Sequence, residues 1–366
     1  MQLLKDQFFN ADFYRQLSRA FARIDPDIDA KNFYQACVKN LPGRELKQRL
    51  QHTADVCRQF LPDSYPQALK RLYALAETID ENSFSYMFMP DFVARYGAHD
   101  FRRSMQALRD FTQYSSSELA VRVFLQQDLE RSLTVIKQWT EHENLHIRRL
   151  ASEGTRPRLP WAMQVKALRD KPEHCTPILN ALHTDREKYV QKSVANHLND
   201  ISRDHPDKML QLVKSWDDST KTTQWIIRHG ARTLVKQGDK RALALFGAAQ
   251  KPSVQISNFK LHSRKLQLGD DLKLALELTS LAKRSQVLVI DYRVHYVKAS
   301  GRTSPKVFKW KTTTLSPGQS LSLNKKHPLK NFTTRKHYAG NHRIELLING
   351  SPMKAAAFEL NTTDSD

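Results

Sequence analysis

The spacing of apolar residues changes near Lys251, and this change limits the fold more than any other feature of the sequence. Before it, apolar residues recur every three or four positions, as in Tyr65–Ile79 and Phe101–Tyr114, which predicts amphipathic helices. Prolines stand where many of these helices would begin or end. We therefore expect a mainly α protein with a helical part over residues 1–250 and a different fold after it.

After Lys251 the chain alternates apolar and polar residues in short runs that turn residues separate. In the clearest run, Tyr292 and Val294 would face one side of a strand, and Asp291 and Arg293 the other. Strands are expected at Val254–Phe259, Leu272–Leu281, Gln286–Val297, Val307–Leu315, Ser320–Leu323, Phe332–Tyr338, His342–Ile348 and Lys354–Leu360. This spacing predicts an all-β, Ig-like sandwich over residues 256–361, reached through a linker near residues 248–255.

The helical half contains an internal repeat. Leu145–Glu153 aligns with Lys188–Asn196 at an offset of 43 residues, and Trp225–Leu234 follows as a third copy. Periods of about 40–47 residues with paired helices are typical of HEAT and armadillo arrays, which stack their layers around one core. The repeat predicts a HEAT-like solenoid, and on architecture alone a scaffold role is the simplest interpretation.

The net charge is +20, with a sequence pI near 9.8. Residues 256–366 carry 19 Lys and Arg against 8 Asp and Glu, a net charge of +11, and the other 255 residues carry +9. Such a surplus favours a nucleic-acid partner over a basic protein that merely repels itself. The β region has its own basic cluster, which either contacts an anion or protects edge strands from aggregation: Lys306, Lys309, Lys311, Lys325, Lys326, Lys330, Arg335 and Lys336.

Basic residues recur at matching positions of the repeat, so we expect a cationic stripe that follows spaced phosphates. The residues expected to contact DNA are Arg148, Arg149, Arg156, Arg158, Lys192, Arg228, Arg232 and Lys236. A HEAT array that binds only protein would also carry charges on this face.

Three carboxylates, Glu118, Glu153 and Asp200, stand in or beside the repeat helices, although a carboxylate repels phosphate. Glu118 could instead offset a helix dipole, and Asp200 could cap a helix or pair with an arginine. Trp161 follows a rigid stretch with two arginines and two prolines. Its indole can face a base or sugar, or it can serve as a wedge between helices.

Cys37, Cys57 and Cys175 are too few and too scattered for a disulfide framework or a zinc site. We expect neither a metal nor a cofactor. No apolar stretch approaches the roughly 18–20 residues of a membrane span, and the N-terminal segment lacks the apolar core of a secretory signal. The simple interpretation is a cytoplasmic protein.

Four segments together carry a family resemblance: SSSELAVRVF, HIRRLASEGTRPRLPWA, SVANHLNDISRDHP and RTLVKQGDKRALALFG. They resemble the AlkC branch of the bacterial DNA alkylation repair glycosylases, the HEAT-like relatives of AlkD, and the β region resembles the Ig-like domain of one AlkC subgroup. The resemblance implies a monofunctional DNA N-glycosylase of base excision repair. It would remove cationic alkylated bases, chiefly 3-methylcytosine and 3-methyladenine, from double-stranded DNA. The similarity to AlkD implies action without flipping the base. A solenoid that wraps a duplex suits a monomer, and we expect it in the cytoplasm with the nucleoid.

The resemblance also implies site residues: the acidic and aromatic residues of the family match Glu118, Glu153, Trp161 and Asp200. Departures from its pattern are mild, at Thr155, His197 and Gly230. As the glycosidic bond breaks, positive charge would develop on the deoxyribose. A carboxylate near the sugar would stabilise this charge and orient the attacking water.

The Ig-like region is expected to add a second DNA contact, or else to be a stabilising appendage. The alternative for the whole chain is a non-catalytic HEAT nucleic-acid binder or scaffold. Such a protein gains nothing from carboxylates in its groove.

Overall fold

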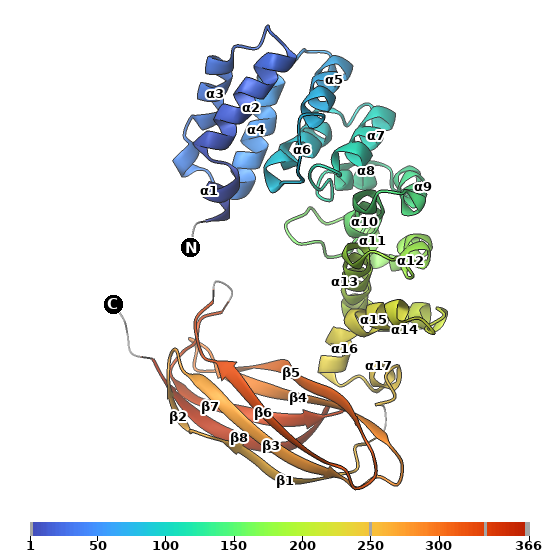
Figure 1. The fold of residues 1–366 in the computed structure, drawn as a ribbon, viewed down its shortest axis with the longest axis vertical. Coiled ribbons are helices and arrows are strands. Elements are labelled where there is room, and N and C mark those ends of the chain that lie inside the picture. The colour runs from blue at the N-terminus through green and yellow to red at the C-terminus, as the bar shows by residue number, and fades with distance from the viewer. Residues whose placement is uncertain (1–2, 249–250, 333–334, 363–366) are drawn as a thin grey trace. The chain divides into compact units, whose positions relative to one another are not determined.

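Helices make up the first of two structural units, and β-strands make up most of the second (Figure 1). The computed structural model describes residues 3–248, 251–332 and 335–362, and the units are Met1–Gly230 and Ala231–Asp366. The boundary lies before the change in apolar spacing, because two short helices group with the strands. Residues 249–250 of the expected linker lie outside the described part.

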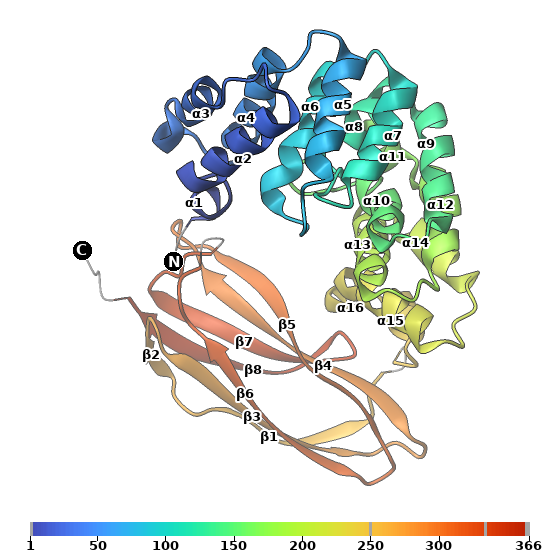
Figure 2. The same cartoon turned by 45° about the horizontal axis from the view of Figure 1, so that its top comes forward.

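In the first unit the helices follow one another along a curved row (Figures 1 and 2). They are α1 (Leu4–Phe8), α2 (Ala11–Ile24), α3 (Ala30–Val38), η1 (Leu41–Gly43), α4 (Leu46–Phe60), α5 (Tyr65–Ala76), η2 (Phe84–Met87), α6 (Phe88–Tyr96), α7 (Phe101–Phe111), α8 (Val121–Gln127), α9 (Leu129–Gln138), η3 (Trp139–Glu141), α10 (Leu145–Gly154), α11 (Lys166–Asp170), η4 (Pro172–Cys175), α12 (Thr176–Leu182), α13 (Lys188–Asp204), α14 (Pro206–Lys214) and α15 (Lys221–Gly230). No helix among the described residues is long and apolar enough to cross a membrane.

Polar residues at the helix starts explain several of these boundaries. The side chain of Asn10 accepts a hydrogen bond from the Phe13 amide at the start of α2, and Asp29, Asp100 and Asp128 cap α3, α7 and α9 in the same way. Each cap satisfies amide groups that have no partner within the helix.

The three predicted copies of the repeat all contain helix, and these helices, α10, α13 and α15, pack on one another in that order. The third copy is interrupted, since α15 ends at Gly230. A β-carbon at Gly230 would lie 2.8 Å from the Cβ of Leu198, so only glycine lets α15 approach α13 this closely.

The second unit contains two short helices and two β-sheets. Its elements are α16 (Arg232–Gln237), α17 (Lys240–Ala244), β1 (Val254–Leu261), β2 (Lys265–Gln267), β3 (Asp271–Ser280), β4 (Gln286–Val297), β5 (Thr303–Leu315), β6 (Ser320–Pro328), β7 (Gly340–Ile348) and β8 (Ser351–Asn361). One sheet has the order β1-β3-β6, and the other β2-β8-β7-β4-β5. The predicted sandwich therefore consists of a three-stranded and a five-stranded sheet.

The interior of the sandwich follows from the alternating pattern. Every second residue of β3 is buried, from Leu272 to Leu278, and packs against residues of the other sheet such as Tyr292 and Ile290. A polar contact also joins the sheets, because the Tyr292 hydroxyl lies 2.9 Å from Nδ1 of His327 on β6.

Two details of the strand prediction were wrong. The expected strand Phe332–Tyr338 does not form: Phe332 and Arg335 make only an isolated bridge, residues 336–338 are irregular, and residues 333–334 lie outside the described part. The three-residue strand β2 was missed, because a segment this short shows no alternation. It pairs in parallel with β8.

The close approach of Gly350 to Gly238 in the second unit should contribute to the free energy of unfolding. It has φ +75° in the β7–β8 turn, and a β-carbon there would lie 2.4 Å from Cα of Gly238. Gly350→Ala should lower the free energy of unfolding by about 2–4 kcal/mol, the sum of backbone strain and a clash. The control is Gly318→Ala, with φ +70° and no atom within 4 Å, which should cost about 1 kcal/mol in urea titrations. Equal losses would show that the close approach is unimportant.

Candidate functional site

Three carboxylates that the sequence places far apart meet in the first unit. Glu118 lies in the turn before α8, Glu153 in the last turn of α10, and Asp200 in the second half of α13. Arginines bridge them in a continuous polar network, so the three predicted site carboxylates form one cluster.

Arg149 joins the first two carboxylates. One terminal nitrogen contacts Oε2 of Glu118 and donates to Oγ of Ser116 over 2.9 Å, and the other lies 3.4 Å from Oε1 of Glu153. Ser116 Oγ in turn donates to Oε2 of Glu118 over 2.7 Å. The guanidinium also lies over the ring of Tyr189, 5.0 Å from its centroid. The arrangement leaves Oε1 of Glu118 without a hydrogen-bond partner among the described residues.

Arg156 joins Glu153 to Asp200. Its Nη1 donates to Oε1 of Glu153 over 2.6 Å, while Nε and Nη2 donate to the two oxygens of Asp200 over 2.8 and 3.2 Å. Ser193 on α13 donates to the second Glu153 oxygen over 2.6 Å. Such bidentate, charge-assisted bonds fix both position and orientation.

The carboxylates differ in their electrostatic environment. Burial raises the pKa of Asp200, and the contacts with Arg156 only partly offset this effect. Burial acts in the same direction on Glu153, but Arg149, Arg156 and the Ser193 hydroxyl together hold its pKa below the ordinary value. The side chain of Glu118 is the most exposed of the three, at 19%. Glu118 is thus the carboxylate best placed to meet a ligand or water.

His197 and Thr155, two departures from the family pattern, belong to the packing below this network. Nδ1 of His197 lies 3.0 Å from the Ser152 carbonyl oxygen, and burial lowers the pKa of the imidazole to about 3. Thr155 donates to the carbonyl oxygens of Ala151 and Ser152 at the end of α10. His197 is therefore neutral near pH 7 and adds no charge to the site.

Trp161 lies in the loop between α10 and α11 and is 66% exposed. Its φ of +64° is unusual for a residue other than glycine, and strain of this kind is often found at functional sites. Nζ of Lys47 on α4 donates to its carbonyl oxygen over 3.2 Å. Its indole is presented to solvent and does not serve as a wedge between helices.

The expected DNA-contacting residues differ in their surroundings. Arg148 is buried, and its guanidinium binds Asp185 and the carbonyl oxygens of His142 and Glu143. This corrects the expectation for Arg148, because a side chain held in this way cannot reach a phosphate. Arg149 and Arg156 belong to the carboxylate network.

The other expected contacts are more open. Arg158 pairs with Asp204 over 2.6 Å but keeps 34% of its side chain exposed. Lys192, Arg228 and Lys236 are exposed, and Arg232 is half-buried. Arg232 and Lys236 belong to the second unit.

Sequence reasoning missed several polar partners of the site residues and one contact between a lysine and an aromatic ring. Ser116 and Ser193 hold the carboxylates, and Asp204 holds Arg158. On α13 and α15, Nζ of Lys188 lies 3.1 Å from the ring centroid of Trp225, which in turn stacks on a histidine. Only the alignment of the repeats could have drawn attention to Lys188, because it is the first residue of the second copy.

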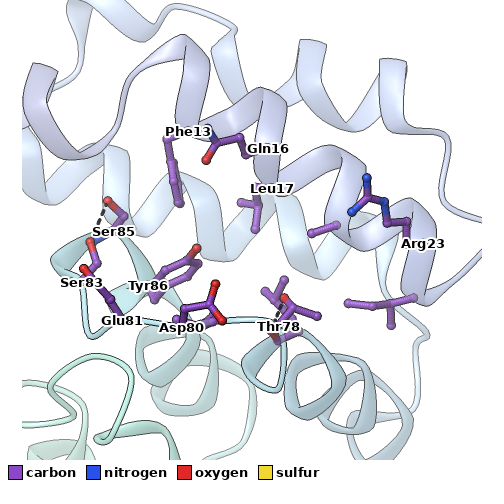
Figure 3. A pocket seen from close by; sticks show the side chains of 14 residues that line it. Phe13, Gln16, Leu17, Arg23, Thr78, Asp80, Glu81, Ser83, Ser85 and Tyr86 are labelled. Carbon is purple, nitrogen blue, oxygen red and sulfur yellow. Dashed lines mark hydrogen bonds between the residues drawn. The ribbon is translucent and has the colours of Figure 1, made fainter.

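A hollow lies away from this network, between α2 and the loop after α5 (Figure 3). Its volume is about 880 Å³, and its lining includes Phe13, Tyr86, Arg23, Asp80 and Glu81. None of the predicted site residues lines it. Among the described residues, no group of three or more His, Cys, Asp or Glu could hold a metal ion.

The fold and the site define a class of protein: a basic array of helices with a buried carboxylate–arginine network and an exposed tryptophan, joined to a β-sandwich. The family model described as "DNA alkylation repair enzyme" matches residues 43–234, and the chain belongs to this family. The model described as "Uncharacterised protein YhaZ, C-terminal Ig-like domain" matches residues 255–362.

Two proteins are similar to the chain over nearly its whole length. The "Uncharacterized protein YhaZ" of Bacillus subtilis is 37% identical over 355 residues, which cover 97% of this chain and 98% of that protein. A solved structure, the Pseudomonas fluorescens alkylpurine DNA glycosylase AlkC bound to DNA containing an abasic site analog, is 40% identical. It covers 98% of this chain and 100% of its own, with a TM-score of 0.95.

Removing Arg156 should show how much its ion pairs with Glu153 and Asp200 contribute to the free energy of unfolding. In Arg156→Met, the buried Glu153 and Asp200 lose their shared partner, so unfolding free energy should fall by about 3–5 kcal/mol at pH 7. A carboxyl group whose folded pKa lies below 4.5, as in Glu153 with Arg156 present, stabilises the fold above pH 4.5, and this contribution disappears as pH falls through the folded pKa. The deficit should therefore shrink as the pH falls below about 4.5.

The control is Arg158→Met, which removes a more exposed pair with Asp204 and should cost less than about 1 kcal/mol. Urea titrations at several pH values give both numbers. A deficit in Arg156→Met that is small, or that does not change with pH, would contradict the coupling.

Proposed function

We propose that the protein is a monofunctional DNA N-glycosylase that excises cationic alkylated bases, 3-methylcytosine and 3-methyladenine, from duplex DNA. The observation that carries the proposal is the cluster of three carboxylates held by arginines in a basic chain that also exposes Trp161. The likeness to an alkylpurine glycosylase over 98% of the chain supports it. The protein would act as a monomer on cytoplasmic DNA, with its first unit as a HEAT-like array.

The chemistry needs little help at the leaving group. An N3-alkylated base already carries positive charge, so it departs as a neutral base without a general acid, a metal or a cofactor. Positive charge then develops on the deoxyribose, and a carboxylate near the sugar stabilises it. This explains carboxylates in a chain with a net charge of +20, because they face the sugar and not the phosphates.

Glu118 is the group we assign to the attacking water. Ser116 and Arg149 hold its Oε2, while Oε1 has no partner in the described part of the chain and is free to accept from a water molecule. Glu153 and Asp200, which are more buried, would supply negative potential and hold the arginines in place. Trp161 would pack against the sugar or the lesion, where its π face favours the cationic state.

The cations that lie outside the carboxylate network and reach the surface would bind the phosphates of the duplex. Lys192 and Arg228 lie on α13 and α15, and Arg158 precedes the tryptophan loop. Arg232 and Lys236 would contribute from the second unit. Contacts of this kind set register and affinity, and they make binding depend on salt.

Neutralising one carboxylate should separate catalysis from binding. Glu118→Gln and Asp200→Asn keep the side-chain shape but remove the charge, so single-turnover release of methylated base should fall by about 10²–10³-fold. Affinity for a duplex with an abasic-site analogue should change by less than about threefold, since phosphate contacts dominate it. The control is Glu141→Gln, an exposed carboxylate in η3. Full turnover by both variants would refute the site assignment.

The competing function is a non-catalytic nucleic-acid binder or scaffold. It predicts salt-dependent binding to DNA and no release of methylated base by the wild-type protein. Chromatography of bases released from methylated DNA therefore decides between the two functions directly.

We also propose that the second unit binds DNA through β5, one of the two edge strands of the five-stranded sheet. Lys306, Lys309 and Lys311 are exposed on it. In Lys309→Gln/Lys311→Gln, duplex affinity should fall, and the slope of log affinity against log salt should flatten by about 1 for each phosphate that is no longer neutralised. Lys260→Gln/Lys273→Gln, on the other sheet, is the control. If the slope of log affinity against log salt is the same in both variants, the β5 lysines do not contact DNA, and their role is to protect the edge strand from aggregation.

A further inference from the structure

Arg122 is a buried arginine outside the carboxylate network, and it contacts the segment that carries Trp161. It lies on α8 and is 1% exposed. Its Nε donates to the Met163 carbonyl oxygen over 2.7 Å. Its Nη1 donates to the carbonyl oxygens of Gly154 and Arg156, each over 2.9 Å. One guanidinium therefore binds both ends of the segment between Gly154 and Met163.

The location of Arg122 connects two parts of the site. It follows Glu118 by four residues, in the same short turn and helix. Trp161 lies inside the segment that Arg122 binds at both ends, and its left-handed backbone conformation needs such external support. Arg122 therefore links the helix that follows Glu118 to the segment that carries Trp161.

The charge of Arg122 is unusual because no carboxylate forms an ion pair with it in the described part of the chain. Burial lowers the pKa of the guanidinium to about 10, so it remains protonated at neutral pH. A buried charge without an ion-pair partner is costly to a fold. Such a residue is better explained by the geometry it imposes than by stability alone.

We propose that Arg122 is a positioning residue, which sets the separation between Glu118 and Trp161 and so holds the gap in which the alkylated nucleoside sits. The inference rests on the proposed glycosylase function. Arg122 touches neither substrate nor water itself. It acts by fixing the two groups that do.

The chain supplies a matched control in Arg49 on α4. This side chain is also buried, and it donates to the carbonyl oxygens of Arg44, Lys5 and Phe9 over 2.8–3.0 Å. Arg49 thus also holds backbone carbonyls, none of which belongs to the Gly154–Met163 segment, and it differs from Arg122 in its ion pair with Asp6. Arg122→Lys and Arg49→Lys should lower thermal stability to a similar extent.

Only Arg122→Lys should impair chemistry. Single-turnover base release from methylated duplex DNA should fall by about 10–10²-fold, as expected when reacting groups are displaced by about 1 Å. Affinity for a duplex with an abasic-site analogue should change by less than about threefold. Arg49→Lys should keep the wild-type rate within about twofold. Equal rate losses in the two variants would overturn the proposal.

A spectroscopic measurement tests the position of Trp161 without any turnover. The protein has five tryptophans, so labelling with 5-fluorotryptophan gives five ¹⁹F signals. The signal that disappears in the Trp161→Phe variant belongs to Trp161. The Trp161 signal should shift or broaden in Arg122→Lys and stay unchanged in Arg49→Lys. An unchanged signal in Arg122→Lys would count against the proposal.

If the Arg122→Lys variant does not fold, the hydrogen bond can be weakened at the Met163 carbonyl oxygen, which accepts from Arg122. Replacing Gln164 by its α-hydroxy acid turns the Met163 carbonyl into an ester, a poorer acceptor for Arg122. The same change at Asn10 weakens the Phe9 carbonyl that Arg49 binds. The ester at 164 should slow base release and move the Trp161 signal, and a wild-type rate there would refute the proposal. Failure of the wild-type protein to release any base would instead refute the proposed function.

Discussion

The buried guanidinium of Arg156 joins Glu153 of α10 to Asp200 of α13, and the rest of the site depends on this contact. Charges taken out of water are expensive, and apolar residues of similar size often stabilise a fold more. Burial raises the pKa of Asp200 even with Arg156 beside it, so the cost is only partly recovered. The proposed function gives a reason for such a costly arrangement, because it assigns the carboxylates a role toward a ligand.

The network also explains how one basic chain can treat phosphate and cation differently. The carboxylates lie between arginines that neutralise most of their charge, so they do not repel a duplex from a distance. Exposed cations such as Lys192 and Arg228 lie on the surface, where the proposed function assigns them to phosphates. Only a group that comes close to Glu118 meets its unpartnered oxygen. Long-range attraction and short-range discrimination are thus assigned to different residues.

Periodicity was enough to predict the helices and the sandwich, because burial imposes its spacing on any amphipathic element. It could not predict β2, which is too short to alternate, or that α16 and α17 group with the sheets. The positions of Glu118, Glu153 and Asp200 came from the family resemblance and the repeats, but their partners did not. Arg148 and Arg149 show why: adjacent helical residues point in directions about 100° apart. One therefore turns inward to Asp185 and the other toward the carboxylates.

Buried arginines recur in the first unit with a common purpose. Arg148, like Arg49, donates to carbonyl oxygens in the connections between helices, where the helices themselves supply no partner. Each of these two also pairs with an aspartate, so its charge is balanced within the fold. Arg122 makes the same carbonyl contacts without a carboxylate, and its carbonyls flank Trp161. The position where the charge is left unbalanced is therefore the position where the backbone must hold a strained, exposed tryptophan.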